Sequence, residues 1–285
     1  MILQSEILQI AEHEGVPPDT IDKNWVLGHF LAGLFSSDWA QENLIFKGGT
    51  CLKKCYYKDY RFSEDLDFTL VAPSFIVTDK LMQTVCKNIT SKTGILLHPQ
   101  KVETIISENQ SCGYKAMIHF WGANHKRNQQ PTLPQRWLTS IKVEIISFEK
   151  LIDVPNYRVL LDDFSDSLQF VGLEIPCYSI FEIVAEKFRS LLQRSYAAPR
   201  DYYDLWHILS SEKIDWNKLL VILKEKLIFK KIQYNNYEDF FEENRLKNVK
   251  REWKNSLQNH IRHVKLPDFE VVLEELKIIC QKYLP

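Results

Sequence analysis

The sequence RFSEDLDFTL, residues 61–70, decides the fold of this chain. Its second half alternates apolar and polar side chains, and a period of two residues predicts a β-strand. Residues i and i+2 of a strand face the same side, so Asp65 and Asp67 project two carboxylates into one space. Neighbouring carboxylates repel each other unless a cation lies between them. The strand is therefore a candidate site for a divalent metal ion.

A second motif, Lys47-Gly48-Gly49-Thr50, precedes the acidic strand. Residues 44–47 predict a short strand and residues 49–57 a helix, with a Gly-Gly turn between them. The start of such a helix presents unpaired backbone N–H groups and a positive dipole end to an anion. A phosphate cradle beside two carboxylates suits metal-assisted phosphoryl or nucleotidyl transfer. A Gly-Gly pair on its own usually marks only a turn. An Asp-x-Asp pair on its own usually has solvated side chains or caps a helix. Because the two motifs occur together in this order and at this separation, we favour a functional site.

Glu144 is the candidate for a third carboxylate. Residues 114–121 and 137–146 predict two further strands. In the second of these, apolar residues alternate with Lys142 and Glu144, which therefore face away from the core. Two-metal nucleotidyl transfer uses a third carboxylate on a neighbouring strand, and Glu144 fits that role. The alternatives are an ordinary exposed glutamate and, for Lys142, either a phosphate contact or a solvated lysine.

After Pro176 the pattern becomes almost entirely helical, and Lys187 stands out there. At helical spacing its neighbours are apolar, so its ammonium needs a partner or an anion unless the stem reaches solvent. We expect it to contact a nucleotide phosphate or Asp204. Asp201 lies close to the start of the next helix, where a structural role is favoured, so Asp204 is the better site candidate. Arg194 falls seven residues after Lys187, on nearly the same face, and either binds triphosphate or acceptor or makes a surface salt bridge.

These motifs resemble a known family. Lys47-Gly48-Gly49-Thr50-x-Leu52, followed by Arg61-x-Ser63-x-Asp65-x-Asp67, is similar to the signature of the AbiEii/AbiGii-type nucleotidyltransferases. These are bacterial toxin components of the polymerase-beta-like nucleotidyltransferase superfamily. A helix with Lys187, followed by Arg200-Asp201-x-x-Asp204-Leu205, matches the later motifs in the same order. The resemblance covers roughly residues 40–210.

The resemblance implies an α+β fold, with a mixed β-sheet flanked by helices and a C-terminal helical domain. We expect a nucleotidyltransferase catalytic domain over residues 1–175 and a helical domain over residues 176–285 that closes the nucleotide cleft. The implied reaction moves NMP from an NTP to an acceptor and releases pyrophosphate. The implied residues are Asp65, Asp67 and Glu144 for Mg²⁺ (or Mn²⁺); Lys47, Gly48, Gly49, Thr50, Lys187 and Arg194 for the nucleotide; and Asp65, Asp67, Glu144, Lys187 and Asp204 for catalysis.

The family more often has Asp at the position of Glu144. The longer side chain of Glu144 changes the geometry that this carboxylate can offer to a metal ion. The tRNA 3′ end is the leading candidate acceptor, with a protein hydroxyl or a small molecule as alternatives. A toxin of this type also implies a cognate antitoxin protein as partner. The alternative function is a catalytically weak nucleotide-binding module that acts through protein partners.

Composition sets further bounds. The chain has 285 residues and a net charge of −1, so no global field recruits nucleic acid. Residues 213–265 nevertheless carry thirteen Lys and Arg against seven Asp and Glu, densest in residues 245–254. This is either a solvated helix face or a patch for a polyanion such as RNA. No apolar run approaches the about 20 residues of a membrane span, so we expect a cytoplasmic protein.

Six cysteines are scattered along the chain. Cys51 and Cys55 lie one helical turn apart, and the others stand alone in the sequence. No pair has the usual zinc-finger spacing. We therefore expect reduced thiols, as in most intracellular proteins.

Overall fold

The computed structural model describes residues 1–107, 110–126, 128–170, 172–262 and 265–284. The chain divides into two compact units. The first comprises Met1–Glu149 and Pro155–Cys177, and the second comprises Lys150–Val154 and Tyr178–Pro285. The assignment of a catalytic and a helical domain to these parts of the chain stays a prediction.

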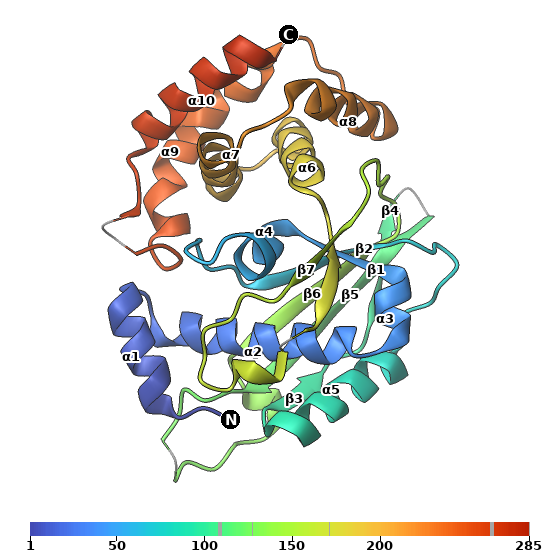
Figure 1. Cartoon of the computed structure of the whole chain (residues 1–285), viewed down its shortest axis with the longest axis vertical. Helices are drawn as coiled ribbons and strands as arrows, with labels where there is room; N and C mark the ends of the chain where they lie inside the picture. The colour runs from blue at the N-terminus through green and yellow to red at the C-terminus, as the bar shows by residue number, and fades with distance from the viewer. Residues whose placement is uncertain (108–109, 127, 171, 263–264, 285) are drawn as a thin grey trace. The chain divides into compact units, whose positions relative to one another are not determined.

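A mixed β-sheet forms the centre of the first unit (Figure 1). In the described residues, eight strands join in the order β3-β5-β6-β2-β1-β8-β7, and β4 pairs with β5. Strand β2 runs parallel to β6 and antiparallel to β1, which in turn runs parallel to β8. The predicted α+β fold with a mixed sheet is confirmed. The strands are β1 Leu44–Lys47, β2 Asp65–Leu70, β3 Leu96–Pro99, β4 Glu103–Ser107, β5 Gln110–Trp121, β6 Ser140–Ile146, β7 Asn156–Val159 and β8 Glu174–Cys177.

Helices α2 and α5 pack side by side in this unit (Figure 1), because Gly33 lets Ile89 approach. Phe35 of α2 lies 5.9 Å from Phe68 of β2, ring centre to ring centre, and Phe46 of β1 lies 5.3 Å from the same ring. Helix α2 therefore covers the apolar face of the central strands. The helical segments are α1 Gln4–Glu14, α2 Pro18–Phe35, α3 Asp38–Asn43, α4 Gly48–Cys51, a π-helical turn Leu52–Tyr56, α5 Asp79–Thr93, and 3₁₀ turns at Pro134–Arg136 and Ser167–Phe170.

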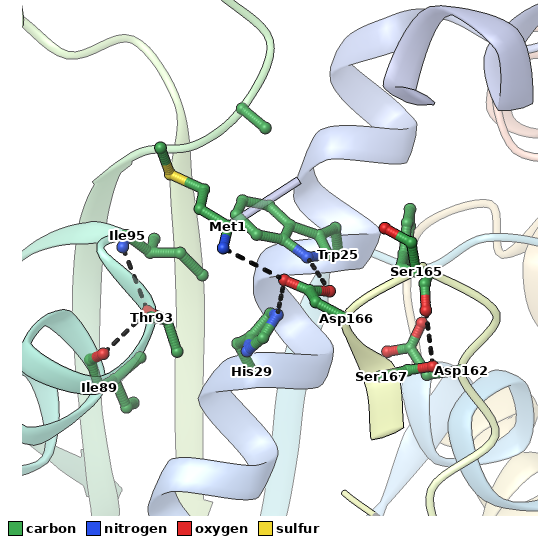
Figure 2. A network of polar contacts seen from close by, with 12 residues as sticks. Met1, Trp25, His29, Ile89, Thr93, Ile95, Asp162, Ser165, Asp166 and Ser167 are labelled. Carbon is green, nitrogen blue, oxygen red and sulfur yellow. Dashed lines mark hydrogen bonds and ion pairs between the residues drawn. The ribbon is translucent and has the colours of Figure 1, made fainter. Parts of the chain in front are cut away.

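Asp166 joins the N-terminus of the chain to helix α2 (Figure 2). Its carboxylate accepts a hydrogen bond from Trp25 Nε1 at 3.1 Å, and it lies 3.3 Å from His29 Nε2 and 3.8 Å from the amino group of Met1. Burial acts to raise the pKa of Asp166, but the hydrogen bonds from His29 and Trp25 and the nearby positive charges hold that pKa below its usual value. The carboxylate is thus stabilised in its charged form.

In Asp22 of α2, the effect of burial on the carboxyl pKa outweighs that of the hydrogen bonds. Its Oδ1 accepts a hydrogen bond from Ala123 N at 2.7 Å, yet burial raises the pKa of its carboxyl to about 6. Because this folded-state pKa lies above the unfolded value, the stability that Asp22 contributes is complete below about pH 4 and is lost as the pH rises through about 6.

Asp22→Asn should therefore gain unfolding free energy relative to the wild type as the pH rises from about 4 to about 7, because Asn cannot ionise. Urea unfolding of both proteins at several pH values measures this difference. Asp59→Asn, at an exposed position, is the control and should follow the wild type. A constant difference between Asp22→Asn and the wild type across this range would contradict the assignment.

The second unit is helical, and a buried ion pair holds its detached segment. Lys226 Nζ lies 2.7 Å from Glu182 Oε1, and both side chains are completely buried. Glu182 also accepts hydrogen bonds from the backbone N–H groups of Ile152 and Asp153. Residues 150–154 belong to this unit for that reason. The helices are α6 Ile180–Gln193, α7 Pro199–Ser211, α8 Trp216–Phe229, a 3₁₀ turn Tyr237–Phe241, α9 Glu243–Leu257 and α10 Phe269–Tyr283.

Across the part of the chain that the structure describes, no helix combines the length and the apolar character needed to cross a membrane.

Candidate active site

Three carboxylates project from one face of the sheet in the first unit. Strands β2 and β6 are parallel neighbours, with Asp67 beside Glu144 and Asp65 beside Lys142. Register partners face the same side of a sheet, so Asp65, Asp67 and Glu144 share one face. Phe68, which alternates with them, lies buried on the opposite face. The fold thus places on one face of the sheet the three residues that the sequence suggests for metal binding.

Gly48 places the start of α4 directly against Asp67. Its φ of +79° is a left-handed conformation that side chains disfavour, and a Cβ atom there would lie 2.4 Å from Asp67 Oδ2. A Cβ atom at Gly49 would lie 2.6 Å from Arg61 Nη2 and 3.1 Å from Ser63 Oγ. Gly48 is therefore required by its backbone conformation and close packing, whereas a side chain at Gly49 would displace the ends of the Arg61 and Ser63 side chains. Arg61 and Ser63 belong to the motif that resembles the family, but the sequence alone gives them no role.

Thr50 and Lys47 connect the same loop to its surroundings. The Thr50 hydroxyl donates a hydrogen bond to the backbone carbonyl of Asp65, which ties α4 to the acidic strand. Lys47 pairs in register with Asp67 on the neighbouring strand, and its buried Nζ lies 3.9 Å from Glu149 Oε2. Sequence reasoning missed Glu149, since no pattern marks a buried carboxylate after β6. The binding of a nucleotide by residues 47–50 stays a prediction.

Lys142 supplies positive charge to the carboxylate set. Its Nζ lies 2.8 Å from Glu144 Oε1. Burial acts to lower the pKa of Lys142, but the hydrogen bond to Glu144 and the charges of Glu144, Asp65 and Asp67 outweigh this and raise it. The lysine is therefore held in its charged form beside the carboxylates.

The donor set fits a hard divalent cation. Burial raises the pKa of Asp65, which Lys142 only partly counteracts, so its charged form needs more positive charge nearby. Three carboxylates on one face offer only oxygen ligands, which Mg²⁺ and Mn²⁺ prefer. Asp65, Asp67 and Glu144 are the residues that would hold such an ion.

In the second unit, Lys187 is buried between two aspartates of α7. Its Nζ lies 3.1 Å from Asp201 Oδ1 and 2.5 Å from Asp204 Oδ2. Arg194 makes an ion pair with the other oxygen of Asp201, so that residue joins the cluster as well. The contact of Lys187 with Asp204 is thus present. A role of Lys187, Arg194 or Asp204 toward a nucleotide stays a prediction.

Lys187→Met should lower the unfolding free energy by about 3–5 kcal/mol, because it removes a buried cation from two carboxylates. The double variant Lys187→Met/Asp204→Asn should recover much of this loss, since the completely buried charge of Asp204 is removed with its partner. Denaturant unfolding measures both effects.

The double variant also separates folding from catalysis. If Lys187 serves the nucleotide, this variant should be folded yet strongly impaired in nucleotidyl transfer. A folded double variant with wild-type activity would restrict Lys187 to a structural role.

Comparisons with known proteins identify the family and the fold of the chain. A family model described as "Nucleotidyl transferase AbiEii toxin, Type IV TA system" matches residues 29–275. A solved structure of MenT4, a nucleotidyltransferase toxin from Mycobacterium tuberculosis H37Rv, is 19% identical with a TM-score of 0.58, over 84% of this chain and 77% of that one. A crystal structure of JHP933 from Helicobacter pylori is 15% identical with a TM-score of 0.50, over 94% of this chain and 93% of that one.

At these identities the two structures show a shared fold. Comparison with curated proteins gives no match. The family model extends over most of the sequence, including the glycine motif, the acidic strand and the helices with Lys187 and Asp204. This chain belongs to the AbiEii family of nucleotidyl transferase toxins of type IV toxin–antitoxin systems.

Proposed function

We propose that this protein uses Mg²⁺ to transfer a nucleoside monophosphate from an NTP to the 3′ end of tRNA, with release of pyrophosphate. The observation that carries the proposal is the register of β2 with β6, which puts Asp65, Asp67 and Glu144 on one face. The close approach of Gly48 to Asp67 adds a backbone turn suited to an anion beside these carboxylates.

Each group then has a distinct part. Asp65, Asp67 and Glu144 would hold Mg²⁺, which would supply positive charge for the phosphates and make the acceptor hydroxyl more acidic. Backbone N–H groups of residues 48–50 bind the triphosphate, and Asp67 or Glu144 accepts the proton of the acceptor hydroxyl. Family motif order supports the assignment of Lys187 and Arg194 to the phosphates, with Lys47 contributing from the glycine motif and Asp204 positioning Lys187.

The choice of acceptor rests on the family rather than on the basic stretch of α9. Lys247 lies 2.8 Å from Glu243, and Arg251 lies 3.2 Å from Glu252. Lys250 makes an ion pair with Glu270. Glu243 and Glu252 are already included in the charge count for residues 213–265, and only Glu270 lowers the positive excess further, so the basic stretch alone does not select RNA as the acceptor.

Labelling tests the proposal directly. The protein is incubated with each α-labelled NTP, with Mg²⁺, Mn²⁺ or a chelator, and with total RNA, total protein, or tRNA whose 3′ end has been oxidised. We expect metal-dependent label in tRNA and none in oxidised tRNA. Label confined to the protein fraction would overturn the tRNA acceptor but keep the transfer reaction. Absence of label in every fraction, with a folded protein, would overturn transfer itself.

One observation favours a second candidate, a catalytically weak nucleotide-binding module acting through protein partners. The family more often has Asp where this chain has Glu144, and the Glu144 carboxylate is already bound to Lys142.

If this pairing limits the metal site, Glu144→Asp should increase transfer, because the shorter side chain leaves Lys142 and matches the family. If Glu144 is a full ligand, Glu144→Asp should leave the transfer rate similar or reduce it, and Glu144→Gln should abolish transfer. Steady-state rates of the three proteins decide between the two functions.

A further inference from the structure

Three cysteines far apart in the sequence meet inside the first unit. The Sγ atoms of Cys51, Cys55 and Cys177 all lie within 4.8 Å of one another. Their residues are at most 1% exposed, and all three are free thiols. A metal ion bonded to three sulfurs at about 2.3 Å holds the sulfurs about 4 Å apart in a planar arrangement. Only small side-chain adjustments separate the observed cluster from that geometry.

The topology of the sheet creates this cluster. Cys51 is the last residue of α4, which directly follows β1, and Cys55 lies in the next turn. Cys177 ends β8, which pairs in parallel with β1 through the partners Cys177 and Phe46. The two strands therefore deliver their carboxyl ends, and with them the three thiols, to one place. The sequence shows only the spacing of Cys51 and Cys55, and not the approach of Cys177.

The helical turn that carries Cys55 is itself unusual. Residues Leu52–Tyr56 form a π-helix, which the N–H of Tyr57 closes by a hydrogen bond to Leu52 O at 2.8 Å. Such wide turns are rare and occur frequently at functional sites. The π-helical turn thus sets the position of Cys55 relative to Cys51.

Two cationic side chains, Arg158 and Lys54, lie close to the cluster. Arg158 Nε donates a hydrogen bond to the backbone carbonyl of Cys55 at 3.0 Å. Lys54 also lies nearby, but its charge is matched by Asp162 at 3.0 Å. Arg158 therefore supplies the positive charge that the cluster retains.

We propose that Cys51, Cys55 and Cys177 form a binding site for a thiophilic divalent cation of the Zn²⁺ type, distinct from the carboxylate site. Each thiol loses its proton to solvent when its sulfur binds the ion. Three thiolates and a divalent ion carry one net negative charge, which Arg158 balances. With Cu⁺ two negative charges would remain, so charge favours the divalent ion, although thiolates suit both. Unliganded, the same residues would be small apolar packing groups in the core.

Metal titration of the reduced, tag-free protein tests the site. Zn²⁺ is added in competition with a chromophoric chelator, Cd²⁺ serves as a probe of sulfur ligation through its near-ultraviolet charge-transfer absorption, and Cu⁺ is tested without oxygen. We expect one Zn²⁺ or Cd²⁺ per chain, a thiolate absorption on Cd²⁺ addition, and a higher unfolding temperature with metal. Preferential one-to-one binding of Cu⁺ would overturn the choice of a divalent ion.

Matched variants locate the ligands. Cys177→Ser should lose the Cd²⁺ absorption, whereas replacement of the cysteines outside the cluster, Cys86, Cys112 and Cys280, by Ser should retain it. If Cys177→Ser fails to fold, thiol counting in the wild type replaces it: bound metal should protect three of the six cysteines from alkylation during denaturation. Binding that survives in folded Cys177→Ser, no binding in the wild type, or protection of other cysteines would overturn the proposal. None of these measurements depends on nucleotidyl transfer.

Discussion

Asp67→Asn should reduce nucleotidyl transfer by about 10³-fold or more, because it removes a charged ligand at the centre of the carboxylate face. Asp67 lies between Gly48 of the glycine motif and Glu144 of β6. Asn has nearly the same shape, so the close contact with Gly48 is kept. The loss of one like charge also relieves repulsion, and the unfolding free energy should be unchanged or higher.

Rates of transfer and denaturant unfolding of the same preparations check this expectation. Glu103→Gln is the matched control, since Glu103 lies on β4 of the same sheet and pairs with Lys115 at the surface. It should keep wild-type activity. Transfer by Asp67→Asn within about tenfold of the wild type would remove the Asp pair from the mechanism.

Gly48→Ala should weaken NTP binding by more than about tenfold and reduce transfer further. The substitution combines a left-handed backbone with a Cβ atom 2.4 Å from the Asp67 carboxylate, so α4 or Asp67 must move. The chain offers a close control in Gly94, which has a φ of +78° but nothing within 4 Å of an added Cβ. Gly94→Ala should cost about 1–2 kcal/mol of stability through backbone strain alone and leave transfer intact.

Calorimetric titration with a non-hydrolysable NTP analogue, together with unfolding curves, separates these effects. If both alanine variants lose stability but only Gly48→Ala loses affinity, the close approach at Asp67 is the cause. Unchanged affinity in folded Gly48→Ala would remove the glycine motif from nucleotide binding.

Local patterns in the sequence predicted the elements that carry the site. Strands β2 and β6 alternate apolar and polar residues, and this alternation identified the face of Asp65, Asp67 and Glu144. The pairing of Asp67 with Glu144 is a contact between distant segments, and its register depends on the whole sheet. The family resemblance, not the periodicity, supplied the expectation that they meet.

Other parts of the fold had no local signal. Strands β4 and β7 are largely exposed and short, so their residues do not alternate between core and solvent. Strand β8 contains Pro176, which argues against a strand in any sequence pattern. The attachment of residues 150–154 to the second unit depends on Glu182 and Lys226. Charged residues such as these are normally expected at the protein surface. Buried ion pairs of this kind are recognised only after the fold is known.

The position of β2 between two hydrogen-bonded neighbouring strands has a consequence for the thermal inactivation of the enzyme. A strand paired on both edges exchanges its amide protons only in the larger openings of a domain, whereas edge strands exchange in small local fluctuations. The proposed metal ligands Asp65 and Asp67 are therefore borne on one of the slowest-exchanging segments of the first unit. Fraying of the outer strands β7 and β4 should leave them in place, and heat should remove this carboxylate face only when the first unit melts as a whole.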